Sequence, residues 1–115
     1  MARFISVFPV ELKDAPRRVN LPTMFSSDAG ANRIGARVTS GGQPVALSVT
    51  CEGLVIKPDG TKVEITGTVD GNEAYITLPS GAYSVPGVIK VYVTVRGGGQ
   101  VTTLLEGAGM VRGVS

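Results

Sequence analysis

The sequence predicts a single all-β domain, and three observations lead to that fold class. The 115 residues include 16 glycines and 7 prolines, a composition typical of short strands joined by many turns. Apolar and polar residues alternate along several segments, which is the pattern of a strand with one buried face. No window shows the 3.6-residue apolar period of an amphipathic helix. A chain of this length can bury one core without disulfides or a metal.

The N-terminal segment, residues 1–16, is expected to be an extended arm. Pro9 removes a backbone donor from the middle of RFISVFPVEL, so this stretch forms an edge strand at most or lies on another surface. Two of the three phenylalanines, Phe4 and Phe8, fall within it, and they need a surface to cover them. That surface belongs either to the same domain or to a neighbouring subunit.

The sandwich domain is expected to span residues 17–115 and to begin with three strands. A short strand is predicted around residues 18–24, followed by the turn run SSDAG. Residues 33–39 alternate cleanly and predict a second strand. After the turn SGGQP the chain continues as a strand over residues 45–56, whose last three residues are apolar on both faces, as in a central strand.

Residues 53–78, GLVIKPDGTKVEITGTVDGNEAYITL, predict a three-stranded meander. Two turn motifs, KPDG at 57–60 and VDGN at 69–72, divide the segment. The glycine of each Asp-Gly pair tolerates the positive φ of a tight hairpin. The segment between the turns and the one after them each carry one apolar face, so the meander has to pack on a second layer.

The remaining segments complete the expected strand pattern. Residues 79–87 are a connection with room for one helical turn, because Ser80 can cap it and Pro86 ends it. Residues 88–96 form the longest alternating run, and GGG at 97–99 closes a hairpin into a strand up to Glu106. The glycine-rich end after Glu106 fits a final edge strand or a tail. The whole pattern predicts an immunoglobulin-like β-sandwich of about seven to nine short antiparallel strands behind the extended N-terminal arm.

The sequence lacks most of the residue types that commonly form catalytic and metal-binding sites. It holds no histidine, no tryptophan and one cysteine, Cys51, which we interpret as a buried small side chain because nothing basic adjoins it. A glycosidase needs two carboxylates across a cleft. Glu64 and Glu73 could be near cross-strand neighbours on the polar face, but we interpret them as solvated charges on a strand surface. We therefore predict no enzyme, no metal and no cofactor.

Charge and composition argue against two classes of partner. The net charge is +2, too small to steer the chain strongly toward nucleic acid or an anionic membrane. Arg33 and Arg37 share a face with no aromatic between them, whereas a nucleic-acid surface interleaves the two. The apolar run between Arg3 and Pro9 is too short for a signal peptide or a membrane span. With no possible internal disulfide, folding is expected in a reducing compartment, the cytoplasm.

Three stretches together resemble β-sandwich modules of tailed-bacteriophage virion proteins. They read NRIGARVTSGGQPVALS, then GLVIKPDGTKVEITGTVDGNEAYITLP, then SGAYSVPGVIKVYVTVRGGGQVTTL, and the resemblance covers residues 17–106. It is closest to the phage head fibre family, whose N-terminal part attaches to the capsid surface. The N-terminal domain of phage baseplate upper proteins shares a related spacing of its G, PDG and LP elements.

The resemblance implies a structural protein of the virion, assembled in the bacterial host cytoplasm. A fibre would continue beyond its attachment domain, whereas this sequence ends at Ser115, so the expectation is a capsid decoration protein or the base of a short head fibre. The implied partners are the major capsid protein or neighbouring virion subunits, and closed symmetry makes a homotrimer plausible. Within the arm and the start of the sandwich, the residues predicted to make capsid or inter-subunit contacts are Phe4, Phe8, Arg17 and Arg18.

Two other functions remain open from the sequence. The same module could be a baseplate or adhesion component of the tail. It could also be a carbohydrate-binding sandwich, for which Tyr75, Tyr83 and Tyr92 are the available stacking residues.

Overall fold

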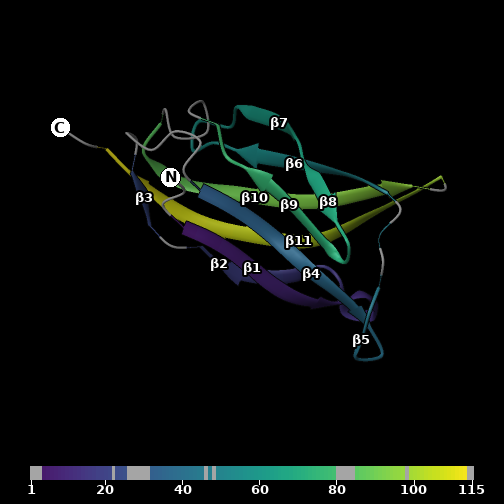
Figure 1. Cartoon of the computed structure of the whole chain (residues 1–115). Coiled ribbons are helices and arrows are strands. Elements are labelled where there is room, and N and C mark those ends of the chain that lie inside the picture. The colour runs from purple at the N-terminus through teal and green to yellow at the C-terminus, as the bar shows by residue number, and fades with distance from the viewer. Residues whose placement is uncertain are drawn as a thin grey trace.

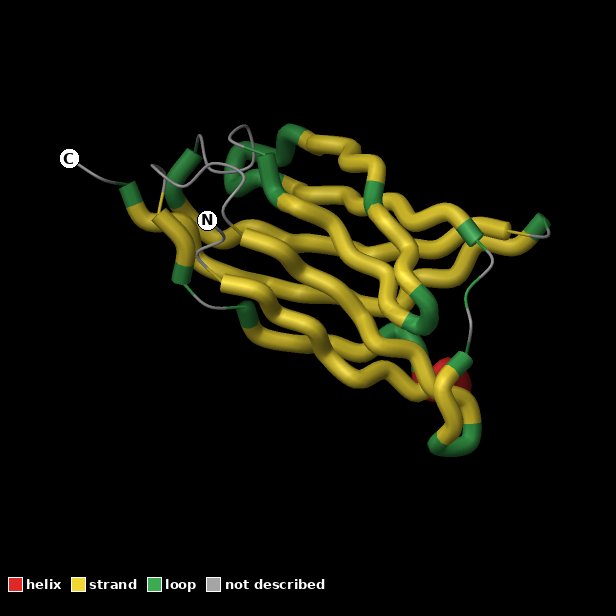
Figure 2. The backbone as a smooth tube through the Cα atoms, viewed as in Figure 1, coloured by secondary structure: helices red, strands yellow, loops and turns green. Residues whose placement is uncertain are grey.

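The computed structural model describes residues 4–21, 23–25, 32–45, 47, 49–79, 85–97 and 99–113. Within them, eleven strands form two sheets in a sandwich-like arrangement (Figures 1 and 2). Sheet A contains β1 (Phe4–Glu11), β4 (Asn32–Ser40), β5 (Gln43–Pro44), β8 (Thr68–Asp70) and β9 (Glu73–Thr77). Sheet B contains β2 (Arg17–Asn20), β3 (Met24–Phe25), β6 (Thr50–Ile56), β7 (Lys62–Thr66), β10 (Gly87–Gly97) and β11 (Gln100–Arg112). A 3-10 turn, η1 (Leu12–Asp14), connects β1 to β2. None of the described helices is long and apolar enough to cross a membrane.

Both sheets mix parallel and antiparallel pairing. The strand order is β1-β4-β9-β8 in sheet A and β2-β11-β10-β6-β7 in sheet B, with β5 added beside β4 and β3 beside β11. β1 runs parallel to β4, and β2 and β3 run parallel to β11, whereas the other pairs are antiparallel. The all-β prediction is confirmed. The immunoglobulin-like prediction is not, because that fold consists of two antiparallel sheets.

The core lies between the sheets and uses the inner face of each strand. In β4 the alternate residues Ile34, Ala36 and Val38 are buried, as the sequence predicts, although Gly35 between them is buried too. In β10 the four inner residues are buried and alternate with more exposed ones. The largest fully buried side chains are Ile34, Ile76, Leu78, Ile89, Leu104 and Leu105. They come from both sheets, so one hydrophobic core holds the sandwich together.

The two predicted hairpin turns are present, but the predicted meander is wrong. Gly60 N–H donates to Lys57 O at 2.9 Å in the first turn, and Gly71 has a φ of 62° in the second. However, β7 pairs with β6 in sheet B, whereas β8 and β9 pair in sheet A. The chain crosses from one sheet to the other at Gly67, so the segment forms two hairpins that face each other across the core (Figure 1).

The C-terminal segment also differs from its prediction. Instead of an edge strand or a tail, residues 107–112 continue β11, which lies between β10 and the two short strands β2 and β3. Its small residues make this position possible, because a Cβ on Gly107 would lie 3.1 Å from the Leu21 side chain. The helical turn predicted at residues 80–86 falls mostly outside the described residues.

The N-terminal strand β1 forms an edge of sheet A, which agrees with the reading of Pro9 as an edge-strand residue. It pairs with β4 from Phe4 to Glu11, and Val10 is 1% exposed. The segment thus covers the core of its own domain. The division into an arm of residues 1–16 and a domain of residues 17–115 stays a prediction.

Candidate functional site

Of the four predicted contact residues, Phe8 and Arg17 come together where β1 and β2 meet. The two strands belong to different sheets and lie on the same side of the sandwich, joined by η1. The Arg17 guanidinium carbon lies 5.9 Å from the centroid of the half-buried Phe8 ring. Arg17 Nη1 also donates to Pro9 O at 2.7 Å. Arg17 therefore links the sheets through a cation–π contact and a charge-assisted hydrogen bond.

Arg18 points to the opposite side of β2, onto the outer face of sheet B. Successive residues of a strand alternate between faces, so Arg17 and Arg18 cannot belong to one cluster. Arg18 Nε lies 3.4 Å from Glu106 Oε2, and its side chain is 85% exposed. The fourth predicted residue, Phe4, pairs through its backbone with Asn32, and its side chain lies outside the described part of the structure. Whether any of the four contacts another subunit stays a prediction.

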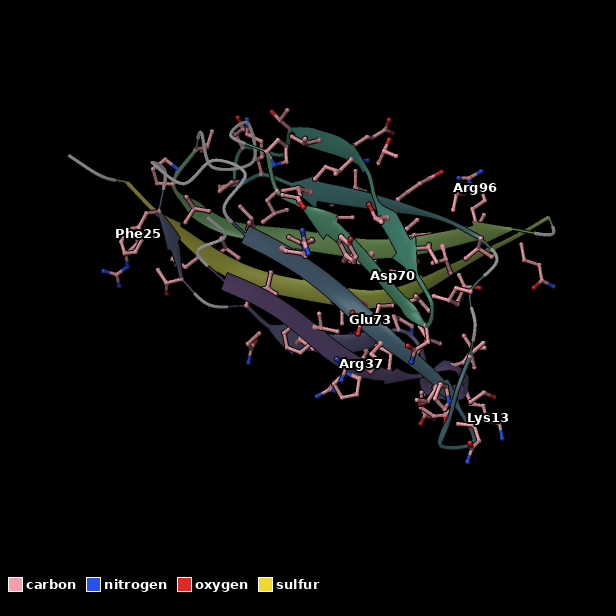
Figure 3. All side chains as sticks on the ribbon, viewed as in Figure 1. Lys13, Phe25, Arg37, Asp70, Glu73 and Arg96 are labelled. Carbon is pink, nitrogen blue, oxygen red and sulfur yellow. The ribbon has the colours of Figure 1, made fainter. Side chains whose placement is uncertain are left out.

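The outer face of sheet A is occupied by contacts within the chain. The Arg33 guanidinium carbon lies 4.4 Å from the centroid of the Tyr75 ring. Arg37 Nε lies 3.1 Å from Glu73 Oε2, and Figure 3 shows these two side chains close together on the face toward the viewer. Both pairs join β4 to β9. Both arginines thus contact a side chain of β9, although the buried Arg33 Nε has no hydrogen-bond partner among the described residues.

The outer face of sheet B is the more apolar of the two faces. Three of the four exposed large apolar side chains in the described residues lie on it: Val88, Val101 and Met110. Val88 and Met110 are cross-strand partners, and Val101 pairs with Arg96. A shallow groove of roughly 800 Å³ on this face is lined by side chains of four strands, including Glu52, Leu54, Glu64, Thr94, Arg96 and Thr103. Val88 and Met110 form one exposed apolar pair, whereas Val101 lies eight residues farther along the β10–β11 pairing, opposite Arg96.

The carboxylates and tyrosines that the sequence analysis considered for catalysis or glycan binding do not come together in one described site. Glu64 lies in β7 of sheet B and Glu73 in β9 of sheet A, so the two carboxylates are not cross-strand neighbours. Tyr75 and Tyr92 lie on the outer faces of different sheets and cannot form one stacking platform. Tyr83 falls outside the described residues. Across the described segments, no group of three His, Cys, Asp or Glu side chains is placed to hold a metal.

Cys51 lies in the core, as the sequence predicts. It is 3% exposed, and its Sγ lies 3.8 Å from Tyr75 O. Burial, with a smaller contribution from the Glu52 charge, raises the pKa of the Cys51 thiol from 9.0 to about 11. The thiolate is the reactive form of cysteine, so this side chain is inert at neutral pH.

We expect native Cys51 to react with a thiol reagent at least about 100-fold more slowly at pH 8 than in the unfolded chain, since a rise of two pKa units alone lowers the thiolate fraction by that factor. The native rate should keep rising about tenfold per pH unit until the pH approaches 11. Stopped-flow labelling from pH 7 to 10 measures both rates. A native rate that levels off near pH 9 would contradict the raised pKa.

Sequence reasoning found the residues at the β1–β2 corner but missed the outer face of sheet B. Val88, Val101 and Met110 are spread over the C-terminal third of the chain. The hairpin signal at residues 97–99 indicates that β10 and β11 pair. A register extended from that turn fails beyond Thr94, where a bulge shifts the pairing by one residue, so it would have placed Met110 on the inner face.

Comparison with known proteins gives a fold neighbour but no family. No family model matches the sequence, and no curated protein matches it. Among solved structures, the fold is similar to the N-terminal domain of phage TP901-1 ORF48, with a TM-score of 0.63 and 11% sequence identity. The similarity covers 94% of this chain and 98% of that domain. At this identity the likeness is one of fold.

Proposed function

We propose that the chain is a non-enzymatic structural component of a phage virion that works by docking onto neighbouring subunits. The observation that carries the proposal is the fold likeness to the N-terminal domain of a phage protein over 94% of the chain. The resemblance of residues 17–106 to virion modules supports the same conclusion independently of the coordinates.

Within the virion, we place the chain on the head, as a capsid decoration protein or the base of a head fibre bound to the major capsid protein. The support for this finer assignment is the resemblance to the head fibre family. The second candidate is a tail baseplate module, which the resemblance to baseplate upper proteins favours. The homotrimer expected from the resemblance belongs to the head assignment and is the alternative to the two-fold dimer inferred below, and the sedimentation experiment described there separates the two.

Gold labelling of the chain in purified particles distinguishes the two locations. Label on the head supports capsid decoration, label at the tail tip supports the baseplate module, and particles without the chain would contradict the virion proposal altogether. Mass spectrometry of the same particles serves as a control for antibody access.

The outer face of sheet B is the docking surface that the structure favours. It carries the exposed side chains Val88, Val101 and Met110 and the predicted contact residue Arg18. The core of a protein interface is apolar and its rim is charged, and this face offers both kinds of side chain. Both outer faces carry Arg–Glu pairs, so the exposed apolar side chains are what distinguishes sheet B.

Reversing the charge of Arg18 tests this surface without disturbing the fold. We expect the Arg18→Glu variant to bind at least about tenfold more weakly than the parent protein to phage particles that were assembled without this protein. Its exposed ion pair with Glu106 contributes only about 0–1 kcal/mol to stability. The matched control is Arg37→Glu, which breaks a similar Arg–Glu pair on the outer face of sheet A. Equal binding by the two variants in a co-sedimentation assay would rule out the outer face of sheet B as the contact.

A further inference from the structure

The open edge of sheet B differs from the other sheet edges of the domain. β7 contains five residues with no proline and pairs only with β6 in the described structure. It lies at the rim of the molecule, at the top in Figure 1. A strand at a sheet edge presents unpaired backbone donors and acceptors that a further strand can bind.

The other edges are blocked or short. β1 carries Pro9, and Arg17 Nη1 donates to the outward-facing Pro9 O at 2.7 Å. At the opposite edge of sheet A, β8 has three residues, and the short strands β2 and β3 at the far edge of sheet B have four and two. β7 is therefore the edge best able to accept another strand.

The hydrogen-bond register shows which backbone groups of β7 face outward. Lys57 N–H donates to Thr61 O at 2.8 Å, and Gly67 N–H donates to Cys51 O at 2.8 Å. Bonded and non-bonded residues alternate in an antiparallel pair, so the odd-numbered residues of β7 bond to β6. The backbone groups of Lys62, Glu64 and Thr66 point toward the open side.

The charges on this edge are complementary to a second copy of themselves. Lys62 and Glu64 are both exposed and lie on the outer face of the sheet, and their partners in β6 are the apolar Ile56 and Leu54. If two β7 strands pair antiparallel around a two-fold axis at Val63, each Lys62 stands opposite the Glu64 of the other copy. A register centred on Glu64 or on Lys62 would place like charges opposite each other. Opposite charges stabilise such cross-strand pairs, and like charges destabilise them.

The same pairing would cover apolar surface. Val63 and Ile65 face the core but are only partly buried, because sheet A ends in the short strand β8 on this side. In the two-fold register, Val63 packs against its own symmetry mate. The edge thus combines free backbone groups, charge complementarity and half-covered apolar side chains.

We propose that the chain forms a two-fold homodimer by antiparallel pairing of β7 with β7 of a second copy, joining the two B sheets into one. The register places Lys62 opposite Glu64 twice and Val63 on the axis, as an isologous contact requires. The dimer follows from strand order and charge alone and does not rest on the proposed virion function.

Sedimentation equilibrium of the purified chain at low salt is the first test. We expect a monomer–dimer equilibrium in which Lys62→Glu and Glu64→Lys each weaken dimerisation by about tenfold, because each change turns two opposite-charge pairs into like-charge pairs. The double variant, with both changes, should recover most of the loss. The control Lys90→Glu changes a charge on β10 in the middle of the sheet and should leave the dimer unchanged.

Glu64→Pro tests the backbone pairing. The Glu64 N–H points to the open edge, so proline removes no hydrogen bond to β6 but blocks the added strand. We expect this variant to be a folded monomer by circular dichroism and sedimentation. A chain that is monomeric at all concentrations, a trimer, a dimer that survives Glu64→Pro, or a double charge variant no better than the single ones would each overturn the proposal.

Discussion

Replacing Gly67 with alanine is expected to destabilise the domain by about 3 kcal/mol, the upper part of the range for overpacked sites. Gly67 is the one residue between β7 in sheet B and β8 in sheet A. A Cβ there would lie 2.6 Å from Cys51 Sγ and 2.7 Å from Tyr75 O. The backbone cannot move away freely, because Gly67 N–H donates to Cys51 O at 2.8 Å.

Urea unfolding measures the loss, and the double variant Cys51→Ala/Gly67→Ala identifies its cause. Removing the sulfur relieves one of the two close contacts but leaves the Tyr75 carbonyl oxygen in place. The double variant should therefore be more stable than the sum of the single changes predicts and still less stable than Cys51→Ala. A Gly67→Ala chain within about 0.5 kcal/mol of the parent would show that the crossing tolerates a side chain.

The sequence could not reveal the crossing at Gly67, because the alternation of side chains continues through it. Val63, Ile65 and Val69 face the core, and Gly67 falls at the inward position between them. If the alternation of inward and outward side chains is uninterrupted, one continuous strand and two strands in different sheets have the same sequence pattern. The turn motifs on either side were found because Asp-Gly has a local conformational preference, whereas a sheet crossing at one glycine has none.

Burial was predictable where one face of a strand covers the core, and so was pairing across a tight turn, whereas the pairing of strands distant in the sequence was not. β4 and β10 follow their alternation because each has one sheet face inside the sandwich. β1 pairs with β4, and β2 pairs with β11, in parallel and without a tight turn between them. Such pairing cannot be predicted from the local spacing of residues. Pro9 did indicate an edge strand, since its missing donor excludes a central position.

The candidate site divides in the same way. The sequence singled out Phe8 and Arg17 by residue type, but their contact joins strands of different sheets and carries no sequence signal. It also grouped Arg17 with Arg18, although strand alternation separates neighbouring residues onto opposite faces. The apolar outer face of sheet B depends on the registers of β10 with β11 and β6, which only the structure supplies.

The second large effect is expected where the two sheets approach each other at Gly53 and Ile76. Gly53 is buried in β6, and Ile76 is 1% exposed in β9. A Cβ on Gly53 would lie 2.5 Å from Ile76 Cδ1 and 2.7 Å from its Cγ2. Gly53→Ala should therefore cost about 2 kcal/mol of unfolding free energy by overpacking, and Ile76→Ala about 2–5 kcal/mol by leaving a cavity.

The two changes should compensate each other in part, because the alanine methyl at position 53 enters the space that Ile76→Ala vacates. We expect the double variant to be about 1–2 kcal/mol more stable than the sum of the single effects, measured by urea unfolding. Val111→Ala combined with Gly53→Ala is the control, since the buried Val111 pairs with Gly87, six residues along β10 from Val93, the partner of Gly53. That pair should be additive to about 0.5 kcal/mol. If both double-mutant cycles are additive, Gly53 and Ile76 do not contact each other across the core. The packing of β6 against β9 described above would then be wrong.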